Sequence, residues 1–195
     1  MVTTAVALVL MLVSTVGIER SVRGDRDART LRTTSHDGAS QLAVSAAFIG
    51  ALVVMVVATV AWLAGIARVS SGTAATLVGA AGLALMVVGI AIRVAAMRAL
   101  GDFYTRTLRV TGDHRVVSSG PYRYVRHPGY LGMILVLGGA DVATASWIGL
   151  VAGPVFVVAM YLYRIRAEEQ MLRAELGGEY VAYAARTRRL IPFLY

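Results

Sequence analysis

The sequence predicts an all-α, polytopic integral membrane protein with about five transmembrane helices and a cytoplasmic C-terminal helical segment. Of the 195 residues, 57% are hydrophobic, against an apolar share of roughly 45–50% in soluble domains. The mean hydropathy is +0.69. Several apolar runs are long enough to cross a bilayer, which takes about 20 residues. The arginines between these runs also favour one orientation in the membrane.

Three apolar runs are each expected to form one transmembrane helix: Val2–Ile18, Leu42–Ile66 and Ala74–Ala96. The first run could alternatively be a removable signal peptide. It has no basic residue before it and no small-x-small cleavage pattern near its end, so we interpret it as a retained helix. The third run also contains small residues that suit close helix packing in lipid, namely Gly79, Gly82 and Gly89.

A fourth apolar tract, Gly129–Tyr163, has 35 residues and is too long for one straight crossing. The stretch "DVATASW" within it supplies Asp, Thr and Ser, which favour a tight turn near Asp141–Trp147. We therefore expect two helices here. The polar segment from Arg164 onward is typical of an amphipathic cytoplasmic helix, followed by a break at Gly177–Gly178 and a shorter second helix.

The basic residues are distributed as clusters beside the apolar runs. All 19 are arginine; five lie between the first two runs, only Arg68 lies between the next two, and thirteen lie from Arg93 onward. An outside N-terminus and a cytoplasmic C-terminus then place 18 of the 19 on the cytoplasmic side of a multi-pass cell-membrane protein. The net charge of +8 indicates contact with anionic membrane lipids, because no nucleic-acid motif accompanies it.

The chain is expected to form a single membrane domain over residues 1–195. Within it, residues 1–99 would form a three-helix scaffold part and residues 100–195 a cofactor-binding part. The second part contains the helical hairpin 129–163 and the cytoplasmic tail 164–195. The absence of cysteine excludes disulfides and thiol nucleophiles. The three histidines lie far apart, so no metal site is predicted.

Candidate chemistry begins in the stretch "GPYRYVRHPGYLG". Here His127 precedes Pro128, which suits the first position of a helix because its missing N–H has no partner there anyway. Such a helix N-terminus favours carboxylates and other acceptors. Glu168 lies at the other end of the expected hairpin, so it should come close to His127. Alternatively, Glu168 and Glu169 form only a solvated face that balances nearby arginines.

Two separated motifs carry a family resemblance. "HRVVSSGPYRYVRHPGYLG" and, about thirty residues later, "RIRAEEQMLRAELGGEYVAYAARTRRLIPF" resemble the isoprenylcysteine carboxyl methyltransferase family and the wider phospholipid-methyltransferase-like class of integral-membrane enzymes. The match covers residues 114–193. It implies S-adenosyl-L-methionine as cofactor, in a pocket that faces the cytoplasm and is capped by the C-terminal segment.

The same resemblance implies roles for individual residues. It assigns acceptor binding and catalysis to Arg164. The residues implied to bind the cofactor are His114, Arg115, Val116, Val117, Tyr122, His127, Pro128, Gly129, Tyr130 and Glu168. Two positions depart from the family pattern: Val116 replaces the usual leucine, and Thr107 stands where members that act on prenylated proteins tend to carry glutamine.

The function that follows is methyl transfer from S-adenosyl-L-methionine, at the cytoplasmic membrane face, to a lipophilic or lipidated acceptor that enters from the bilayer. The resemblance makes an isoprenylcysteine-type carboxylate the leading acceptor. Such a carboxylate is ionised at neutral pH and needs no general base. The alternatives are N- or S-methylation of a lipid amine or small thiol, an NADPH-dependent sterol-type reductase, and a non-enzymatic membrane scaffold. Glu168, Glu169 and the His114 stretch favour methyl transfer over reduction.

Overall fold

The computed structural model describes residues 2–14, 37–69, 72–101 and 116–191, and within these ranges the chain is all α, as predicted. Two isolated backbone bridges are the β-type pairings in this part of the chain. The elements, in chain order, are α1 (Val2–Leu12), α3 (Asp37–Leu63), α4 (Thr73–Leu100), the 3₁₀ turn η3 (Gly120–Arg123), α5 (Pro128–Val142) and α6 (Trp147–Arg186).

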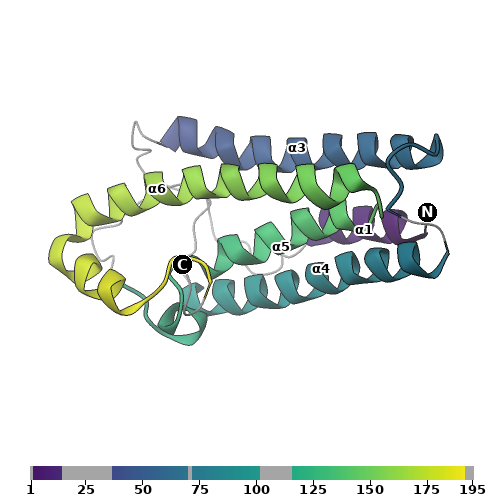
Figure 1. The fold of residues 1–195 in the computed structure, drawn as a ribbon. Helices are drawn as coiled ribbons and strands as arrows, with labels where there is room; N and C mark the ends of the chain where they lie inside the picture. Colours follow the sequence, from purple (N-terminus) through teal and green to yellow (C-terminus); the bar gives the residue numbers. More distant parts are fainter. Residues whose placement is uncertain (1, 15–36, 70–71, 102–115, 192–195) are drawn as a thin grey trace.

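The helices run side by side along one long axis, with the two chain termini near opposite ends (Figure 1). Helix α5 packs against both α4 and α6, while α3 packs mainly on α6 and α1 lies against α4 and α5. The buried core contains small and flexible apolar side chains, such as Ala47, Met86 and Val136. This arrangement places the start of α5 at the same end of the bundle as the C-terminus (Figure 1).

Three helical segments are long and apolar enough to cross a membrane: Leu42–Leu63, Thr73–Leu100 and Trp147–Arg186. Helices α1 and α5 are apolar but shorter. The 15 residues of α5 rise by about 22 Å, whereas the hydrocarbon core is about 30 Å thick. The multi-pass membrane fold is therefore observed, and two of the five expected crossings correspond to short helices. Residues 15–18 of the first expected helix lie outside the described residues.

The hairpin turn predicted near residues 141–147 is confirmed, since α5 ends at Val142 and α6 begins at Trp147. Ser146 caps α6, because its hydroxyl accepts a hydrogen bond from the backbone N of Ile148 at 3.3 Å. The connection between α3 and α4 covers this turn, as the Trp147 N–H donates to the carbonyl of Ala67 at 2.8 Å.

Helix α6 differs from the expectation that the hairpin ends at Tyr163 and a separate tail helix follows. It continues through Arg164 as far as the bend at Gly177, because no helix-breaking residue follows Pro154 until the glycine pair. At Gly177 the backbone is left-handed (φ 53°, ψ −127°) and the helix bends, so the predicted break is confirmed. From Trp147 to the bend at Gly177, α6 would extend about 45 Å, well beyond the hydrocarbon thickness of about 30 Å. The polar part from Arg164 therefore lies beyond the apolar span.

Glycine pairs set the distance between α4 and α5. A Cβ added at Gly82 would lie 2.6 Å from the carbonyl oxygen of Gly139, and one added at Gly89 would lie 2.6 Å from that of Gly132. Each partner glycine makes the reciprocal approach. The two contacts are seven residues apart on both helices, which is about two turns. This close antiparallel register fixes where α5 begins relative to α4.

Candidate functional site

The candidate site is built on the first turn of α5. Pro128 occupies the first helical position and His127 is the N-cap residue, as the sequence predicts. The carbonyl of His127 accepts hydrogen bonds from the backbone N–H groups of Tyr130 and Leu131 at 3.1 and 3.0 Å. The His127 side chain is buried, with 5% of its surface exposed. The imidazole is thus held at a helix N-terminus, where the helix dipole favours negatively charged groups.

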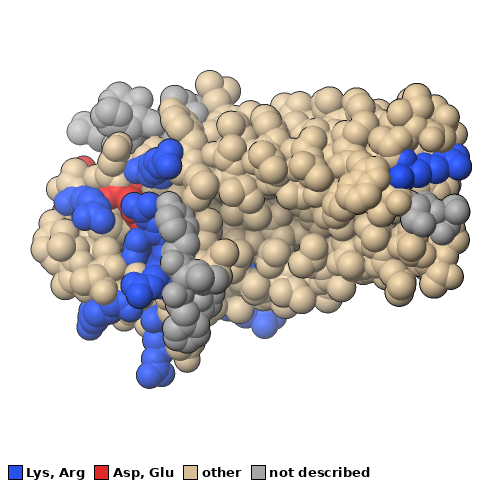
Figure 2. Space-filling view, in the orientation of Figure 1, with Lys and Arg blue, Asp and Glu red and all other residues tan. Residues whose placement is uncertain are grey.

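Positive charge gathers around this end of the bundle. Figure 2 shows Lys and Arg atoms concentrated at the end that carries the bend of α6, next to acidic atoms, while the middle of the bundle surface is uncharged. The chain has no lysine, so these groups are arginines. Arg98, Arg123, Arg166 and Arg173 are exposed there. The arrangement matches a polar membrane interface beside an apolar span.

Tyr130 connects two of the candidate residues. Its ring stacks on the imidazole of His127, with centroids 5.7 Å apart and planes 16° from parallel. Its hydroxyl accepts a hydrogen bond from Nε of Arg164 at 3.1 Å, and its ring also contacts that of Tyr161. Arg164 is only 1% exposed. A buried guanidinium requires close polar partners, and Tyr130 supplies one that orients it.

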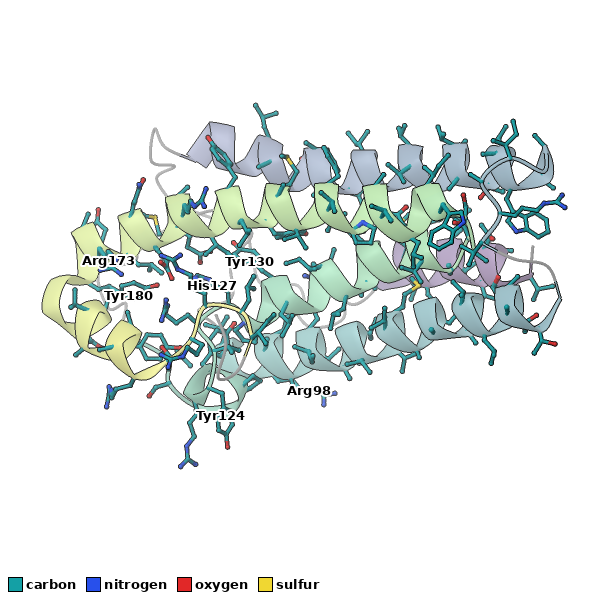
Figure 3. All side chains as sticks on the ribbon, viewed as in Figure 1. Arg98, Tyr124, His127, Tyr130, Arg173 and Tyr180 are labelled. Carbon is teal, nitrogen blue, oxygen red and sulfur yellow. The ribbon has the colours of Figure 1, made fainter. Side chains whose placement is uncertain are left out.

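Glu168 lies one helical turn beyond Arg164, on the same side of α6. Its Oε2 is 3.8 Å from Nδ1 of His127, so the predicted proximity of these two residues is confirmed. Figure 3 shows His127 and Tyr130 between the start of α5 and α6, with Tyr180 inside the bend of α6. The hairpin therefore returns its two polar ends to one place.

Glu169 has buried contacts that the sequence interpretation did not predict. Its Oε1 accepts a hydrogen bond from Nε of Arg126 at 2.9 Å and lies 3.4 Å from Nε2 of His127, while its Oε2 is 3.1 Å from Nε of Arg189. The side chain is only 4% exposed, so the alternative of a solvated glutamate pair is wrong for Glu169. Arg126 is adjacent to His127 and Glu169 to Glu168, but no sequence pattern links either to Arg189.

The charge state of Glu169 follows from these contacts. Glu169 belongs to the polar part of α6, beyond the apolar span. Burial by itself would raise the pKa of its carboxyl, but hydrogen bonds from His127 and Arg126 outweigh burial and lower that pKa to about 2. Glu169 is therefore a carboxylate at neutral pH. A carboxylate cannot donate, so Nε2 of His127 must carry the proton in this contact.

The last described residues of the chain run beside the start of α5. We call residues 187–191 the C-terminal strap. Arg188 forms a parallel bridge with Val125, and its N–H donates to the carbonyl of Tyr124 at 3.1 Å. In return, the N–H of Arg126 donates to the carbonyl of Arg188 at 2.7 Å and that of His127 to the carbonyl of Arg189 at 3.0 Å. The strap thus fixes the backbone of the His127 turn.

The remaining expected cofactor residues are distributed around this centre. The N–H of Val116 donates to Oε1 of Glu179 at 3.0 Å, which ties the segment before η3 to the bent end of α6, and Val117 is half-buried. His114 and Arg115 lie outside the described residues. Metal ligands were not expected, and the described residues contain no cluster of three or more His, Asp or Glu side chains that would hold a metal ion.

Tyr122 and Gly129 flank the His127 turn. Tyr122 is buried, and its carbonyl accepts a hydrogen bond from the hydroxyl of Tyr183 at 2.8 Å. By contrast, Tyr124 is 56% exposed and suits an interfacial aromatic residue. No heavy atom of the described residues lies within 4 Å of a Cβ built on Gly129, so this part of the chain leaves open space beside the first turn of α5.

Two buried polar atoms near this space have no hydrogen-bond partner within the described residues. They are Oε2 of Glu168 and the hydroxyl of Tyr180. A buried polar atom without a partner costs about 1–3 kcal/mol, so each of these two atoms requires an explanation, such as an ordered water, an ion or a bound polar group. Oε2 of Glu168 could accept hydrogen bonds from a bound molecule. The positive dipole end at the N-terminus of α5 could attract a carboxylate of the same molecule.

Comparison with known proteins points to one family. Residues 82–174 match the model of the isoprenylcysteine carboxyl methyltransferase (ICMT) family. A probable protein-S-isoprenylcysteine O-methyltransferase of Oryza sativa subsp. indica is 31% identical over 115 residues, covering 58% of this chain and 60% of the rice protein. Protein-S-isoprenylcysteine O-methyltransferase A of Arabidopsis thaliana is 32% identical over 115 residues, with 58% of each protein covered.

The match spans about three fifths of the length of these curated relatives. Among solved structures, the chain resembles the eukaryotic intramembrane Ras methyltransferase ICMT, with a TM-score of 0.53 and 20% sequence identity. The likeness covers 82% of this chain and 54% of the solved one. At this identity the comparison establishes a shared fold.

Proposed function

We propose that this chain is a member of the isoprenylcysteine carboxyl methyltransferase family, whose model residues 82–174 match, and that it is a membrane methyltransferase that uses S-adenosyl-L-methionine. The proposed acceptor is a lipophilic carboxylate of the isoprenylcysteine type, in a small molecule or a lipidated protein that enters from the bilayer. One observation carries the proposal: the buried guanidinium of Arg164 is fixed by Tyr130 directly beside the His127 turn.

The proposed topology has five crossings in the cell membrane, with the N-terminus outside and the candidate site at the cytoplasmic face. The distribution of arginines supports this orientation, because 18 of 19 then lie on the cytoplasmic side. Arg68, the exception, belongs to the connection between α3 and α4, at the end of the bundle opposite the site. A cytoplasmic site also suits a water-soluble cofactor.

The residues present fit this cofactor. The free N–H groups and dipole at the start of α5 suit its carboxylate. The unpartnered Oε2 of Glu168 suits its ammonium or a ribose hydroxyl, and Tyr122, His127, Pro128, Gly129 and Tyr130 would line the site. Val116 and Val117 would contribute from the preceding segment, next to His114 and Arg115. When bound, the cofactor supplies an electrophilic methyl group on a sulfonium sulfur.

The chain's own contribution is positioning. Arg164 would hold the acceptor carboxylate through charge-assisted hydrogen bonds, with its guanidinium kept in place by Tyr130. The acceptor is already ionised at neutral pH, so no proton would have to be removed. One carboxylate oxygen would supply the electron pair for the new O–CH₃ bond, and the electron pair of the broken S–CH₃ bond would stay on the sulfur, which leaves as a neutral thioether. Burial of Arg164 excludes water from the reacting groups. Such fixed geometry can account for much of the catalysis.

The charge of Arg164 also discriminates among acceptors. A lipid amine is a cation at neutral pH, so a buried guanidinium would repel it and a base would be needed to remove its proton. A carboxylate is attracted instead. The positive charge of Arg164 therefore favours O-methylation of a carboxylate over the alternative of N-methylation of a lipid amine.

Calorimetry on the detergent-purified protein tests the cofactor. We expect saturable binding of S-adenosyl-L-methionine and none of NADPH. Binding of NADPH alone would indicate the sterol-type reductase, and binding of neither would indicate a scaffold. His127→Ala and Glu168→Ala should each weaken binding about tenfold or more, equivalent to about 1.4 kcal/mol, with a folded membrane domain. Glu175→Ala, an exposed change further along α6, is the control; unchanged affinity in both site variants would contradict the site.

Tyr130→Phe separates acceptor binding from cofactor binding, because it removes the hydroxyl that accepts from Arg164 and keeps the ring that stacks on His127. A hydrogen bond to a charged group contributes about 1.5–3 kcal/mol, so the KM for the acceptor should rise about 10-fold to 100-fold. The cofactor dissociation constant should rise less than this KM, because the ring of Tyr130 is kept although its hydroxyl also interacts with Glu168. Tyr124→Phe, at the exposed tyrosine, is the matched control, and a loss of cofactor affinity alone would refute this role.

A further inference from the structure

The Glu169 cluster has no part in the methyl transfer described above, although it lies against the site. The buried carboxylate of Glu169, on α6, contacts Arg126 and His127 from the turn before α5 and Arg189 from the C-terminal strap. Glu169 is the residue in the described part of the chain that contacts all three partners. Its contacts therefore join parts of the chain that are far apart in sequence.

We propose that Glu169 is a positioning residue that holds the C-terminal strap against the first turn of α5 and so closes the cofactor site. This inference rests on the proposed function, since closure matters only if that site binds S-adenosyl-L-methionine. Glu169 itself would touch neither the cofactor nor the acceptor. It would act through His127, Arg126 and Arg189.

The backbone contacts show what the ion pairs hold together. The N–H groups of Arg126 and His127 donate to the carbonyls of Arg188 and Arg189, so the strap and the His127 turn are joined by a short parallel backbone pairing around one isolated bridge. Arg126 adds two hydrogen bonds from Nη1, to the carbonyls of Ala184 and Thr187. A short pairing of this kind is weak by itself. The Glu169 carboxylate strengthens this pairing, because it attracts Arg126 from the His127 turn and Arg189 from the strap.

Glu169 also orients the imidazole of His127. The carboxylate accepts from Nε2, so the ring presents its other nitrogen, Nδ1, to Glu168. Which ring nitrogen carries a proton is set by the partner of the opposite nitrogen. Removing the Glu169 charge would therefore free the ring to turn and leave two arginines facing each other without the anion between them.

The test is Glu169→Gln, with Glu175→Gln as a matched control at an exposed glutamate on the same helix. Hydrogen–deuterium exchange of the peptides that contain residues 124–128 and 186–191 should be about tenfold faster in Glu169→Gln and unchanged in the control. The dissociation constant for S-adenosyl-L-methionine should rise about tenfold. The kcat at saturating cofactor should change less than about threefold, because the reacting groups are intact.

A second pair of variants keeps the proposal testable if Glu169→Gln does not fold. Arg189→Gln removes the strap's contact with Glu169 while Arg126 still neutralises the carboxylate, and Arg188→Gln at the exposed neighbouring arginine is its control. Arg189→Gln should also speed up hydrogen–deuterium exchange and weaken cofactor binding, but each effect should be smaller than in Glu169→Gln.

Unchanged hydrogen–deuterium exchange in both Glu169→Gln and Arg189→Gln would overturn the proposal that Glu169 holds the C-terminal strap. Faster exchange with unchanged cofactor affinity would overturn its role in closing the site. If the wild-type protein bound no S-adenosyl-L-methionine, the proposed function would fail, and the exchange measurement would still decide whether Glu169 holds the strap.

Discussion

Replacing Arg164 with alanine is expected to reduce kcat/KM for a carboxylate acceptor by about 10²- to 10³-fold, as with the loss of one preorganised charge-stabilising donor in other enzymes. The physical reason is that the guanidinium is nearly unexposed and fixed by Tyr130, so water cannot replace it in holding the acceptor. The measurement is transfer of a radiolabelled methyl group from S-adenosyl-L-methionine to a farnesylated cysteine analogue.

Two further variants make this result interpretable. Arg166→Ala removes an exposed arginine two residues along the same helix and should leave activity within about twofold, since exposed ion pairs contribute little. Arg164→Lys keeps the charge but loses the planar fork of donors, so activity should stay well below wild type. Full activity of Arg164→Ala on a carboxylate, with normal thermal stability, would remove Arg164 from the mechanism and reopen amine or thiol acceptors.

Replacing Gly89 with leucine is expected to lower the unfolding temperature by about 6–12 °C, which corresponds to about 3 kcal/mol in a chain of this size. Leucine is a better helix former than glycine, so the loss would come from packing. A Cβ at Gly89 would lie 2.6 Å from the carbonyl oxygen of Gly132, and backbone cannot move aside as a flexible side chain can. The helices α4 and α5 would have to separate.

The unfolding temperature can be followed by the fluorescence of the two tryptophans, Trp62 and Trp147. Gly178→Leu is the control, because no atom in the described part of the chain lies within 4 Å of a Cβ at Gly178. Cofactor affinity should fall together with stability in Gly89→Leu, since α5 carries the His127 turn. An unchanged unfolding temperature would mean that the close α4–α5 register is wrong.

Several features of the fold were predictable because they depend on local properties. The apolar runs, the start of α5 at Pro128, the turn before Trp147 and the bend at Gly177 follow from hydropathy and from the conformational limits of proline and glycine. The proximity of His127 and Glu168 was also predictable, because a helical hairpin returns its ends to one side. The continuity of α6 through Arg164 was missed, since the change from apolar to polar residues suggested a boundary where no residue breaks the helix.

The sequence by itself determined that this chain is a multi-pass α-helical membrane protein with a polar, arginine-rich end and a family motif there. The tertiary structure decided how the polar side chains are used. Glu168 and Glu169 are neighbours, yet successive helical residues point about 100° apart, so the rotation of α6 against α5 selects which one faces Arg126. The contact of Glu169 with Arg189 depends in turn on the bend at Gly177, which returns the strap to the His127 turn. Charges act through space, and only the packed helices and the returning strap bring these groups together.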